Sequence, residues 1–196
     1  QILAKIQRQF YRLSDKIICN SYSQRDWLIK SVKINEKKIE VIYNGYNILK
    51  LKNKDSIKEK TYELVSIGRI HKEKNIHSLI SALKIFNQVN GWIPKVKWVG
   101  RIDNAAYFKF CDNLIKNDHI LNKSWVWCGE IKDTNKLIIA SDALIHTSLY
   151  DGLSNVICES LILGTPVLSG NVCDNKYLLG ENERGLLFNP ADPIDI

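Results

Sequence analysis

Residues 143–168 read ALIHTSLYDGLSNVICESLILGTPVL and decide the fold class of this chain. They contain, in order, a short apolar run, a glycine-bearing loop, an apolar stretch at helical spacing, a Gly-Thr-Pro turn and a second apolar run. A short run that is apolar at every position, such as Ala143-Leu144-Ile145, is typical of a strand buried on both faces. The stretch therefore predicts a strand–helix–strand unit of a parallel sheet.

The same alternation continues on both sides of this stretch. Strands are predicted at residues 63–67, 96–99, 125–128, 143–147, 166–168 and 185–188. Helices are predicted at residues 75–90, 104–117, 133–140, 155–163 and 174–180. Strands that alternate with helices predict an α/β fold, here a Rossmann-like parallel sheet with helices on both faces.

The N-terminal part of the chain lacks this regular alternation. We expect a helix over residues 1–13, a strand over 16–20, a helix over 21–32 and a strand over 38–43. The polar, Lys-rich residues 47–61 are expected to form a linker or a surface excursion.

The positive charge of the chain is confined to its first third. The 196 residues carry a net charge of +7, and residues 1–60 hold 14 Lys and Arg against 6 Asp and Glu, so the remainder is nearly neutral. This distribution disfavours a uniformly basic nucleic-acid-binding protein. The five cysteines form no Cys-x-x-Cys pair, and no run of apolar residues is long enough to span a membrane. We expect buried, reduced thiols rather than a disulfide framework.

Ligands of parallel α/β sheets bind beyond the carboxyl ends of the strands. The first candidate loop there is residues 68–75, in which Arg69 and Lys74 follow Gly68 between a strand and a helix. Glycine permits a sharp turn, while Arg and Lys can both hold phosphate oxygens. The alternative interpretation is a solvent-exposed charged loop.

The second candidate lies in the opening stretch, where Glu159 interrupts an otherwise apolar helix. A carboxylate is costly to bury unless something donates hydrogen bonds to it, and the hydroxyl pair of a ligand could do so. Ser154 or Asn155 can cap this helix, and its N-terminus would face an anion at the sheet edge. The alternative is that Glu159 lies on the exposed stripe of the helix.

Several common site motifs are absent from the sequence. It contains no G-x-G-x-x-G, no P-loop, no G-x-S-x-G elbow, no Asp-x-Asp pair and no metal-ligand spacing among its four histidines. A bound phosphate would therefore depend on protein cations and helix N-termini.

Four motifs occur in an order that resembles the C-terminal half of GT-B glycosyltransferases of the family 4 type, the glycosyl transferases group 1. They are Tyr43-Asn44-Gly45, Gly68-Arg69 with Lys74, Asp151-x7-Glu159 and Gly164-Thr165-Pro166. The resemblance spans residues 14–190 and implies a retaining glycosyltransferase whose C-terminal domain holds a nucleotide-diphosphate-sugar donor. It also implies that residues 1–43 are the end of an N-terminal acceptor domain, and that residues 44–196 are the donor-binding domain, truncated at its C-terminus.

The resemblance assigns roles to particular residues. Arg69 and Lys74 would contact the donor diphosphate and stabilise the leaving group, and Asp151 would lie beside the donor sugar. Glu159 would accept hydrogen bonds from the ribose, and the loop at Glu130 would lie against the base. The residues expected to bind the donor are Gly68, Glu130, Ile131, Gly152, Leu153, Ser154, Asn155 and Glu159.

Three positions depart from the family pattern. Asp151 stands where Glu is usual, Tyr43 replaces the usual Pro, and the Gly100-Arg101-Ile102-Asp103 loop replaces a glycine-rich one. The shorter acidic side chain could shift the sugar contacts, and Arg101 brings an additional cation toward the nucleotide. None of these changes removes the central set of residues.

The resemblance also sets expectations for the whole protein. We expect transfer without a metal or cofactor to a glycan or lipid-linked acceptor of surface polysaccharide or lipopolysaccharide, with no nucleic-acid partner. The expected location is the cytoplasm, at the inner face of the membrane, with peripheral membrane contact. Because the chain starts at Gln1 and contains no Met, we expect a piece of a longer protein that binds donor but transfers sugar poorly or not at all.

Two alternatives remain open at this point. The first keeps the fold but changes the reaction, to a GT-B-related nucleotide-sugar epimerase or phosphorylase. The second is a non-enzymatic basic module that binds nucleic acid or an anionic membrane through residues 1–60.

Overall fold

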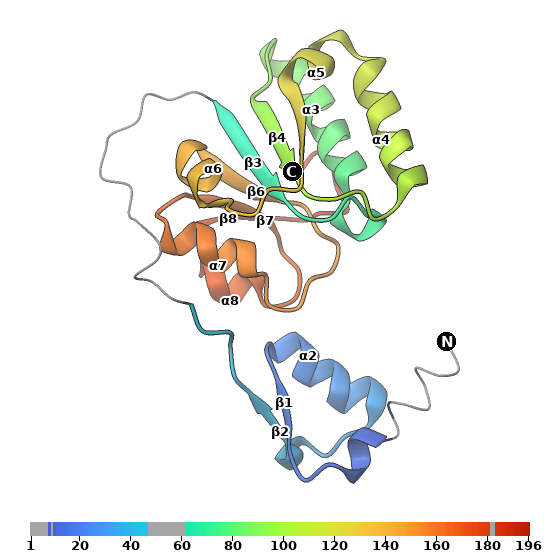
Figure 1. Cartoon of the computed structure of the whole chain (residues 1–196), viewed down its shortest axis with the longest axis vertical. Coiled ribbons are helices and arrows are strands. Elements are labelled where there is room, and N and C mark those ends of the chain that lie inside the picture. The colour runs from blue at the N-terminus through green and yellow to red at the C-terminus, as the bar shows by residue number, and fades with distance from the viewer. Residues whose placement is uncertain (1–7, 9, 47–61, 181–182) are drawn as a thin grey trace.

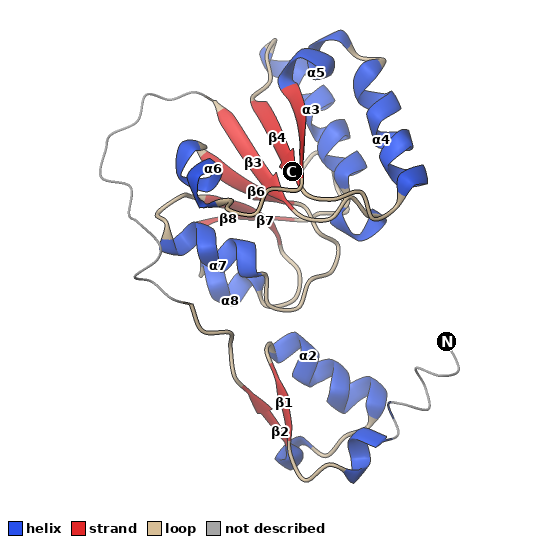
Figure 2. Cartoon of the chain, viewed as in Figure 1, coloured by secondary structure: helices blue, strands red, loops and turns tan. Residues whose placement is uncertain are grey.

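The structure is a computed structural model that describes residues 8, 10–46, 62–180 and 183–196 (Figure 1). Its strands form two parallel sheets, one of two strands near the N-terminus and one of six strands in the remainder (Figure 2). Helices pack around the larger sheet, so the predicted α/β, Rossmann-like class is confirmed.

The six strands of the larger sheet are the six that the sequence predicts. They are β3 (Glu63–Ile67), β4 (Lys95–Val99), β5 (Trp125–Gly129), β6 (Ala143–His146), β7 (Val167–Gly170) and β8 (Gly185–Phe188). Their order is β5-β4-β3-β6-β7-β8, with every pair parallel. From β3 the chain adds β4 and β5 on one side of the sheet, and it then returns to add β6, β7 and β8 on the other side. The crevice above the carboxyl ends of β3, β4 and β6 is therefore the expected ligand position.

Helices cover both faces of this sheet (Figure 1). One group is α3 (Ile76–Asn90), α4 (Ala105–Lys116) and α5 (His119–Ser124). The other group is α6 (Asn135–Ala140), α7 (Asn155–Ile162) and α8 (Asn175–Leu179). The first group buries Leu79, Cys111 and Leu121 in one apolar cluster, and the second buries Ile138 and Ile157 in another.

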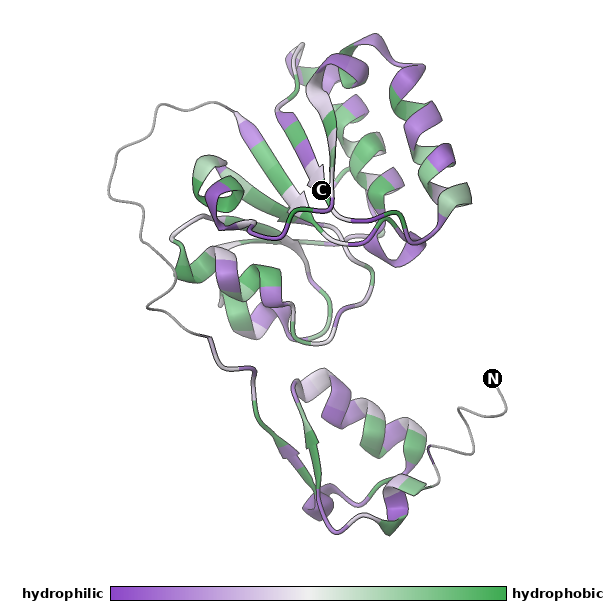
Figure 3. Cartoon of the chain, viewed as in Figure 1, coloured by the Kyte–Doolittle hydropathy of each residue, from purple (hydrophilic) through white to green (hydrophobic). Residues whose placement is uncertain are grey.

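Neighbouring strand residues contribute to opposite clusters. In β6, Leu144 packs in the cluster on the α7 side and Ile145 in the cluster on the α3 side. In β4, Val99 packs on the α7 side and Trp98 on the α3 side. Successive side chains of a strand point to opposite faces, so a sheet covered on both faces must be apolar at consecutive positions. In the hydropathy colouring β3 is green over most of its length, whereas β4 and α4 both carry purple segments between green ones (Figure 3).

The sequence patterns assign no element to residues 118–124, where the structure forms α5. Asp118 begins this helix, because its side chain accepts hydrogen bonds from the backbone N–H groups of Ile120 and Leu121. The helix is too short for its apolar periodicity to be read, and the cap alone signals it.

The N-terminal part forms its own small sheet and core. Its strands are β1 (Ile17–Cys19) and β2 (Ile39–Val41), and its helix α2 (Tyr22–Trp27) continues as a π-helical turn over Leu28–Val32. Short 3₁₀ turns occur at Tyr11–Leu13, Glu36–Lys38 and Lys72–Lys74. The strands and the helix predicted over residues 16–43 are therefore confirmed. Most of the predicted 1–13 helix and the whole 47–61 linker lie outside the described residues.

A buried carboxylate joins the N-terminal part to the larger sheet. Asp174, just before α8, accepts hydrogen bonds from the backbone N–H groups of Tyr22 (2.7 Å) and Ser23 (2.8 Å) and from the Tyr43 hydroxyl (2.8 Å). These contacts hold the start of α2 and the end of the small sheet against the loop after β7. The domain boundary between residues 43 and 44 stays a prediction.

Over the described part of the chain, no helix combines the length and the apolarity needed to cross a membrane.

Candidate functional site

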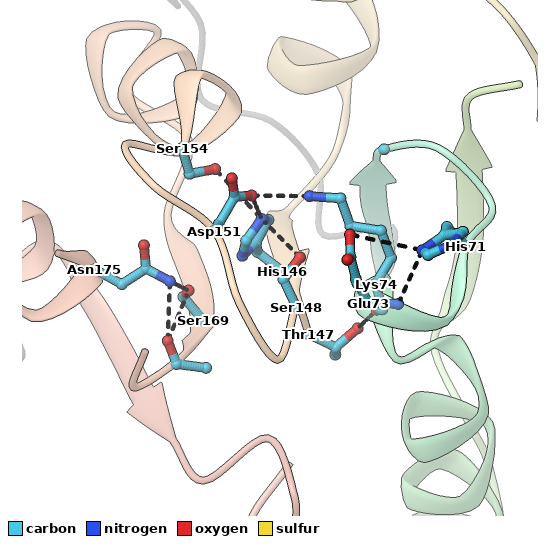
Figure 4. A network of polar contacts seen from close by, with 12 residues as sticks. His71, Glu73, Lys74, His146, Thr147, Ser148, Asp151, Ser154, Ser169 and Asn175 are labelled. Carbon is cyan, nitrogen blue, oxygen red and sulfur yellow. Dashed lines mark hydrogen bonds and ion pairs between the residues drawn. The ribbon is translucent and has the colours of Figure 1, made fainter. Parts of the chain in front are cut away.

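The two loops singled out in the sequence lie against each other at the carboxyl edge of the larger sheet. The Thr147 hydroxyl donates a hydrogen bond of 2.8 Å to the backbone carbonyl of Lys74, and the Leu149 N–H donates one of 2.9 Å to that of Glu73. Because β3 and β6 are neighbours, the loops that follow them meet although they are far apart in the sequence (Figure 4).

An ion pair stands at the centre of this contact. Lys74 Nζ lies 2.8 Å from Asp151 Oδ2, and the two side chains are 18% and 26% exposed. Burial by itself would raise the pKa of Asp151, but hydrogen bonds from His146 and Lys74, with the charge of Lys74, hold it well below its usual range. Asp151 is therefore a charged acceptor at the edge of the site.

His146, the last residue of β6, contacts the same carboxylate. Its Nε2 lies 3.1 Å from Asp151 Oδ2, and the hydroxyls of Ser148 and Ser154 lie 3.3 Å from that nitrogen. The side chain is only 3% exposed, and burial lowers the pKa of the imidazole. Its Nδ1 is buried and has no hydrogen-bond partner among the described residues. None of the sequence motifs assigns this histidine a role.

Arg69 makes a different pair. Its guanidinium lies 2.7 Å from Asp103 Oδ2, and Arg101 lies 3.8 Å from the other oxygen of that carboxylate. Arg69 lies on the loop after β3 and Asp103 on the loop after β4, the other strand that neighbours β3. This pair therefore joins the β3 loop to the β4 loop. Arg69 is half exposed, and an anion at this edge could reach it.

Glycines allow the close approach of these loops. A Cβ on Gly68 would lie 3.2 Å from the Cε atom of Lys74, so the glycine leaves room for that side chain. A Cβ on Gly100 would lie 2.1 Å from the carbonyl oxygen of Gly68, and Gly100 has a φ of +151°. Only glycine fits at position 100, where the β4 loop crosses the β3 loop.

The start of α7 presents its backbone at the same edge. Leu153 and Ser154 are buried, and Ser154 begins the helix without a side-chain cap because its hydroxyl is directed at His146. The side chain of the exposed Asn155 accepts 2.8 Å hydrogen bonds from Asn44 and from the hydroxyl of Tyr46.

Gly152 faces the N-terminal part of the chain. A Cβ at this position would lie 3.7 Å from the Asn20 side chain and 3.8 Å from that of Ser21. The loop before α7 is therefore lined on one side by the N-terminal residues.

Glu159 lies one turn further along α7 and is half-buried. Burial raises the pKa of its carboxyl group, and none of the described residues donates a hydrogen bond or an ion pair to it. Glu159 is therefore neither fully buried nor fully exposed, and its role as a ligand-binding carboxylate stays a prediction beside the exposed-stripe alternative. Among the described residues, Glu159 is a partly desolvated acceptor with no hydrogen-bond donor.

Glu130 and Ile131 lie on the loop after β5 and are both exposed. This loop is linked to the rest of the edge by a 2.7 Å hydrogen bond from the Gly100 N–H to the carbonyl of Gly129. The structure brings Lys74, Asp151 and the start of α7 together, and it leaves Glu130 and Ile131 outside that network. Within the described ranges, no three His, Cys, Asp or Glu side chains gather in a way that could hold a metal ion.

Sequence reasoning missed two further residues at this edge, His146 and Tyr46. The signal for His146 is a polar residue at the end of an otherwise apolar strand, five positions before Asp151. The signal for Tyr46 is weaker, since an aromatic residue after an Asn-Gly turn has no specific meaning by itself.

The chain matches two family models. "Glycosyl transferases group 1" covers residues 47–196, and "Glycosyltransferase Family 4" covers residues 1–48. Among curated proteins it is 25% identical over 195 residues to the UDP-Gal:alpha-D-GlcNAc-diphosphoundecaprenol alpha-1,3-galactosyltransferase of Escherichia coli, covering 92% of this chain and 49% of that protein. It is 28% identical over 146 residues to the capsular polysaccharide biosynthesis glycosyltransferase CapH of Staphylococcus aureus, covering 74% of this chain and 40% of that protein.

Solved structures share the fold. The crystal structure of HepE from Anabaena in complex with UDP-glucose superposes with a TM-score of 0.82 at 20% identity, over 97% of this chain and 56% of that one. A glycosyltransferase from Rickettsia africae superposes with a TM-score of 0.83 at 18% identity, over 96% of this chain and 54% of that one. The chain spans about half the length of the curated relatives that it matches.

Proposed function

Because the chain belongs to the glycosyl transferases group 1 family, we propose that it binds the nucleotide-diphosphate-sugar donor of a retaining glycosyltransferase. The whole protein would transfer the sugar to a glycan or lipid-linked acceptor during assembly of a surface polysaccharide or lipopolysaccharide. The names of the E. coli and S. aureus relatives support this class of acceptor. The observation that carries the proposal is the joining of Lys74, Asp151 and the start of α7 at one sheet edge.

The donor diphosphate would lie between the two cations of the β3 loop and the first turn of α7. Lys74 and Arg69 each have a carboxylate partner now, and an incoming diphosphate would compete for both cations. Preorganised cations and a helix N-terminus stabilise the negative charge that develops on a departing nucleoside diphosphate. Because these cations and the helix N-terminus can supply such stabilisation, we propose that transfer needs no metal.

The two acidic residues would hold the sugars of the donor. Glu159 is unpaired among the described residues and half-buried, so it can accept hydrogen bonds from the ribose hydroxyls. Asp151 is charged and lies beside the phosphate-binding cation, so it can accept hydrogen bonds from the transferred sugar. The loop at Glu130 and Ile131 would contact the base. The location at the inner face of the membrane stays a prediction.

Isothermal titration calorimetry of the 196-residue chain with UDP, GDP and their hexose conjugates tests donor binding. We expect selective binding to one nucleotide and a loss of about tenfold or more in affinity in Arg69→Ala and in Glu159→Ala, since each removes a hydrogen bond to a charged group. Lys84→Ala is the matched control, because Lys84 pairs with Asp118 at 3.6 Å, away from the site. Absence of binding to every nucleotide would overturn the proposal.

A further inference from the structure

His146 ends β6 with its imidazole almost fully enclosed by protein. The protonation of the ring is determined by its surroundings. An ionised carboxylate only accepts hydrogen bonds, so the nitrogen that faces Asp151 Oδ2, Nε2, must carry the proton. The other nitrogen, Nδ1, is buried without a partner among the described residues, which places the lone pair of a neutral ring there. Burial favours this neutral form.

Lys74 and His146 therefore both contact Oδ2 of Asp151, but an anionic ligand can compete for Lys74 and not for His146. Lys74 is a cation with a partly exposed side chain at the open edge of the site. His146 is neutral, is enclosed behind Asp151 and has hydroxyls on both flanks, so an anion can neither reach nor attract it. If a diphosphate draws Lys74 toward itself, His146 is the donor that remains to Asp151 among the described residues. Figure 4 shows both donors at the Asp151 carboxylate.

We propose that His146 is a positioning residue that holds the Asp151 carboxylate toward the donor sugar while Lys74 contacts the donor diphosphate. This inference rests on the proposed function, and it adds a residue for which the sequence motifs have no place. The pairing gives Asp151 a fixed orientation whether or not Lys74 is engaged, because the imidazole is buried at the end of β6. In the proposed function the base contacts the loop at Glu130 and the ribose contacts Glu159, and neither contacts Asp151. His146 should therefore affect recognition of the sugar and not of the nucleotide.

The test compares the affinities of a nucleoside diphosphate and its sugar conjugate in the 196-residue chain by calorimetry. The probes are UDP with UDP-galactose and GDP with GDP-mannose, and the pair that binds the wild type is used. In His146→Leu we expect the sugar conjugate to lose about tenfold in affinity relative to the diphosphate alone. His146→Gln keeps an N–H near the position of Nε2 and should restore the wild-type ratio to within about threefold.

Ser169→Ala is the matched control, because Ser169 is a fully buried polar residue on neighbouring β7 whose hydroxyl accepts from Asn175 and not from the Asp151 network. Its ratio should equal that of the wild type. If the ratio of the two affinities in His146→Leu equals that of the wild type, whether both affinities fall equally or neither falls, the inference is overturned and the proposed function stays intact. If the wild type binds none of the four probes, the proposed function falls and this inference falls with it.

A measurement on the wild type tests the inference even if the His146→Leu variant does not fold. The ¹⁵N chemical shifts of the His146 ring report which nitrogen carries the proton. We expect a neutral ring protonated at Nε2 at pH 7. A ring protonated at Nδ1 alone could not donate to Asp151 and would overturn the inference without any substitution.

Discussion

Replacing Asp174 with Asn tests the contact that joins the N-terminal part to the larger sheet. In the wild type Oδ2 accepts from the Tyr22 N–H and the Tyr43 hydroxyl, and Oδ1 accepts from the Ser23 N–H. An amide has the same shape but only one accepting atom, so at least one donor faces an NH₂ group. A buried hydrogen bond to a charged group is worth about 1.5–3 kcal/mol, and we expect Asp174→Asn to lower the free energy of unfolding by about 2 kcal/mol.

The pH dependence of this difference follows from the carboxyl group. Burial by itself would raise the pKa of Asp174, but hydrogen bonds from Ser23, Tyr22 and Tyr43 lower it. A lowered pKa stabilises the fold above the ordinary Asp pKa of about 3.9, and this stabilisation is lost as the pH falls through the folded-state pKa. The difference between wild type and Asp174→Asn should therefore be full at pH 7 and shrink steadily below pH 4.

Urea unfolding followed by tryptophan fluorescence gives the free energy, and amide hydrogen exchange at Tyr22 and Ser23 reports the contact directly. Asp26→Asn is the control, since Asp26 lies on α2 with Tyr22 and Ser23 and, within the described part of the chain, makes only an exposed pair of 3.7 Å with Lys30. It should change stability by less than about 0.5 kcal/mol. If Asp174→Asn stays within that range and leaves exchange at Tyr22 and Ser23 unchanged, Asp174 does not hold the two parts together.

Three further changes probe the site itself. Lys74→Met should raise the pKa of Asp151, because among the described residues the carboxylate then keeps only His146 as a partner. A ¹³C titration of the Asp151 carboxyl measures this, and an unchanged pKa would contradict the ion pair. Glu159→Gln should melt about 2 °C higher than wild type at pH 7 without ligand, because burial penalises the charged carboxylate. This difference in melting temperature should vanish as the pH falls and Glu159 takes up a proton. A lower melting temperature with normal nucleotide affinity would argue against a ligand-binding role. Gly100→Ala should lower the free energy of unfolding by about 3 kcal/mol or more, because its Cβ meets the Gly68 carbonyl oxygen at 2.1 Å. Gly91→Ala is the control, since Gly91 has a φ of +74° but open space around it, and it should cost about 1 kcal/mol. Similar losses of unfolding free energy for the two variants in urea titrations would refute the close approach.

The fold class could be predicted because burial leaves a local signature. A strand covered on both faces must be apolar at consecutive positions, and Ala143-Leu144-Ile145 shows this without any long-range information. The helix between Asn155 and Ile162 shows its spacing in the same way. The short helix α5 escaped prediction because its stability comes from one cap and from packing against α3 and α4.

The candidate site could be predicted as positions but not as contacts. A parallel sheet places every strand's carboxyl end at one edge, so the loops at Gly68 and Asp151 were expected there. The burial of His146 and its role behind Asp151 depend on how the α7 loop folds back over the end of β6, which no local pattern encodes.

By itself the sequence determined the strands, most helices and the edge at which the charged residues gather, since each depends on neighbours along the chain. The tertiary structure decided which charges pair. Arg69 and Lys74 share one loop after β3, yet Arg69 pairs with Asp103 after β4 and Lys74 with Asp151 after β6. The sheet order places β4 on one side of β3 and β6 on the other, so the two cations are divided between two carboxylates. That division leaves Lys74 beside Asp151, and it follows from the packing of strands that are distant in the sequence.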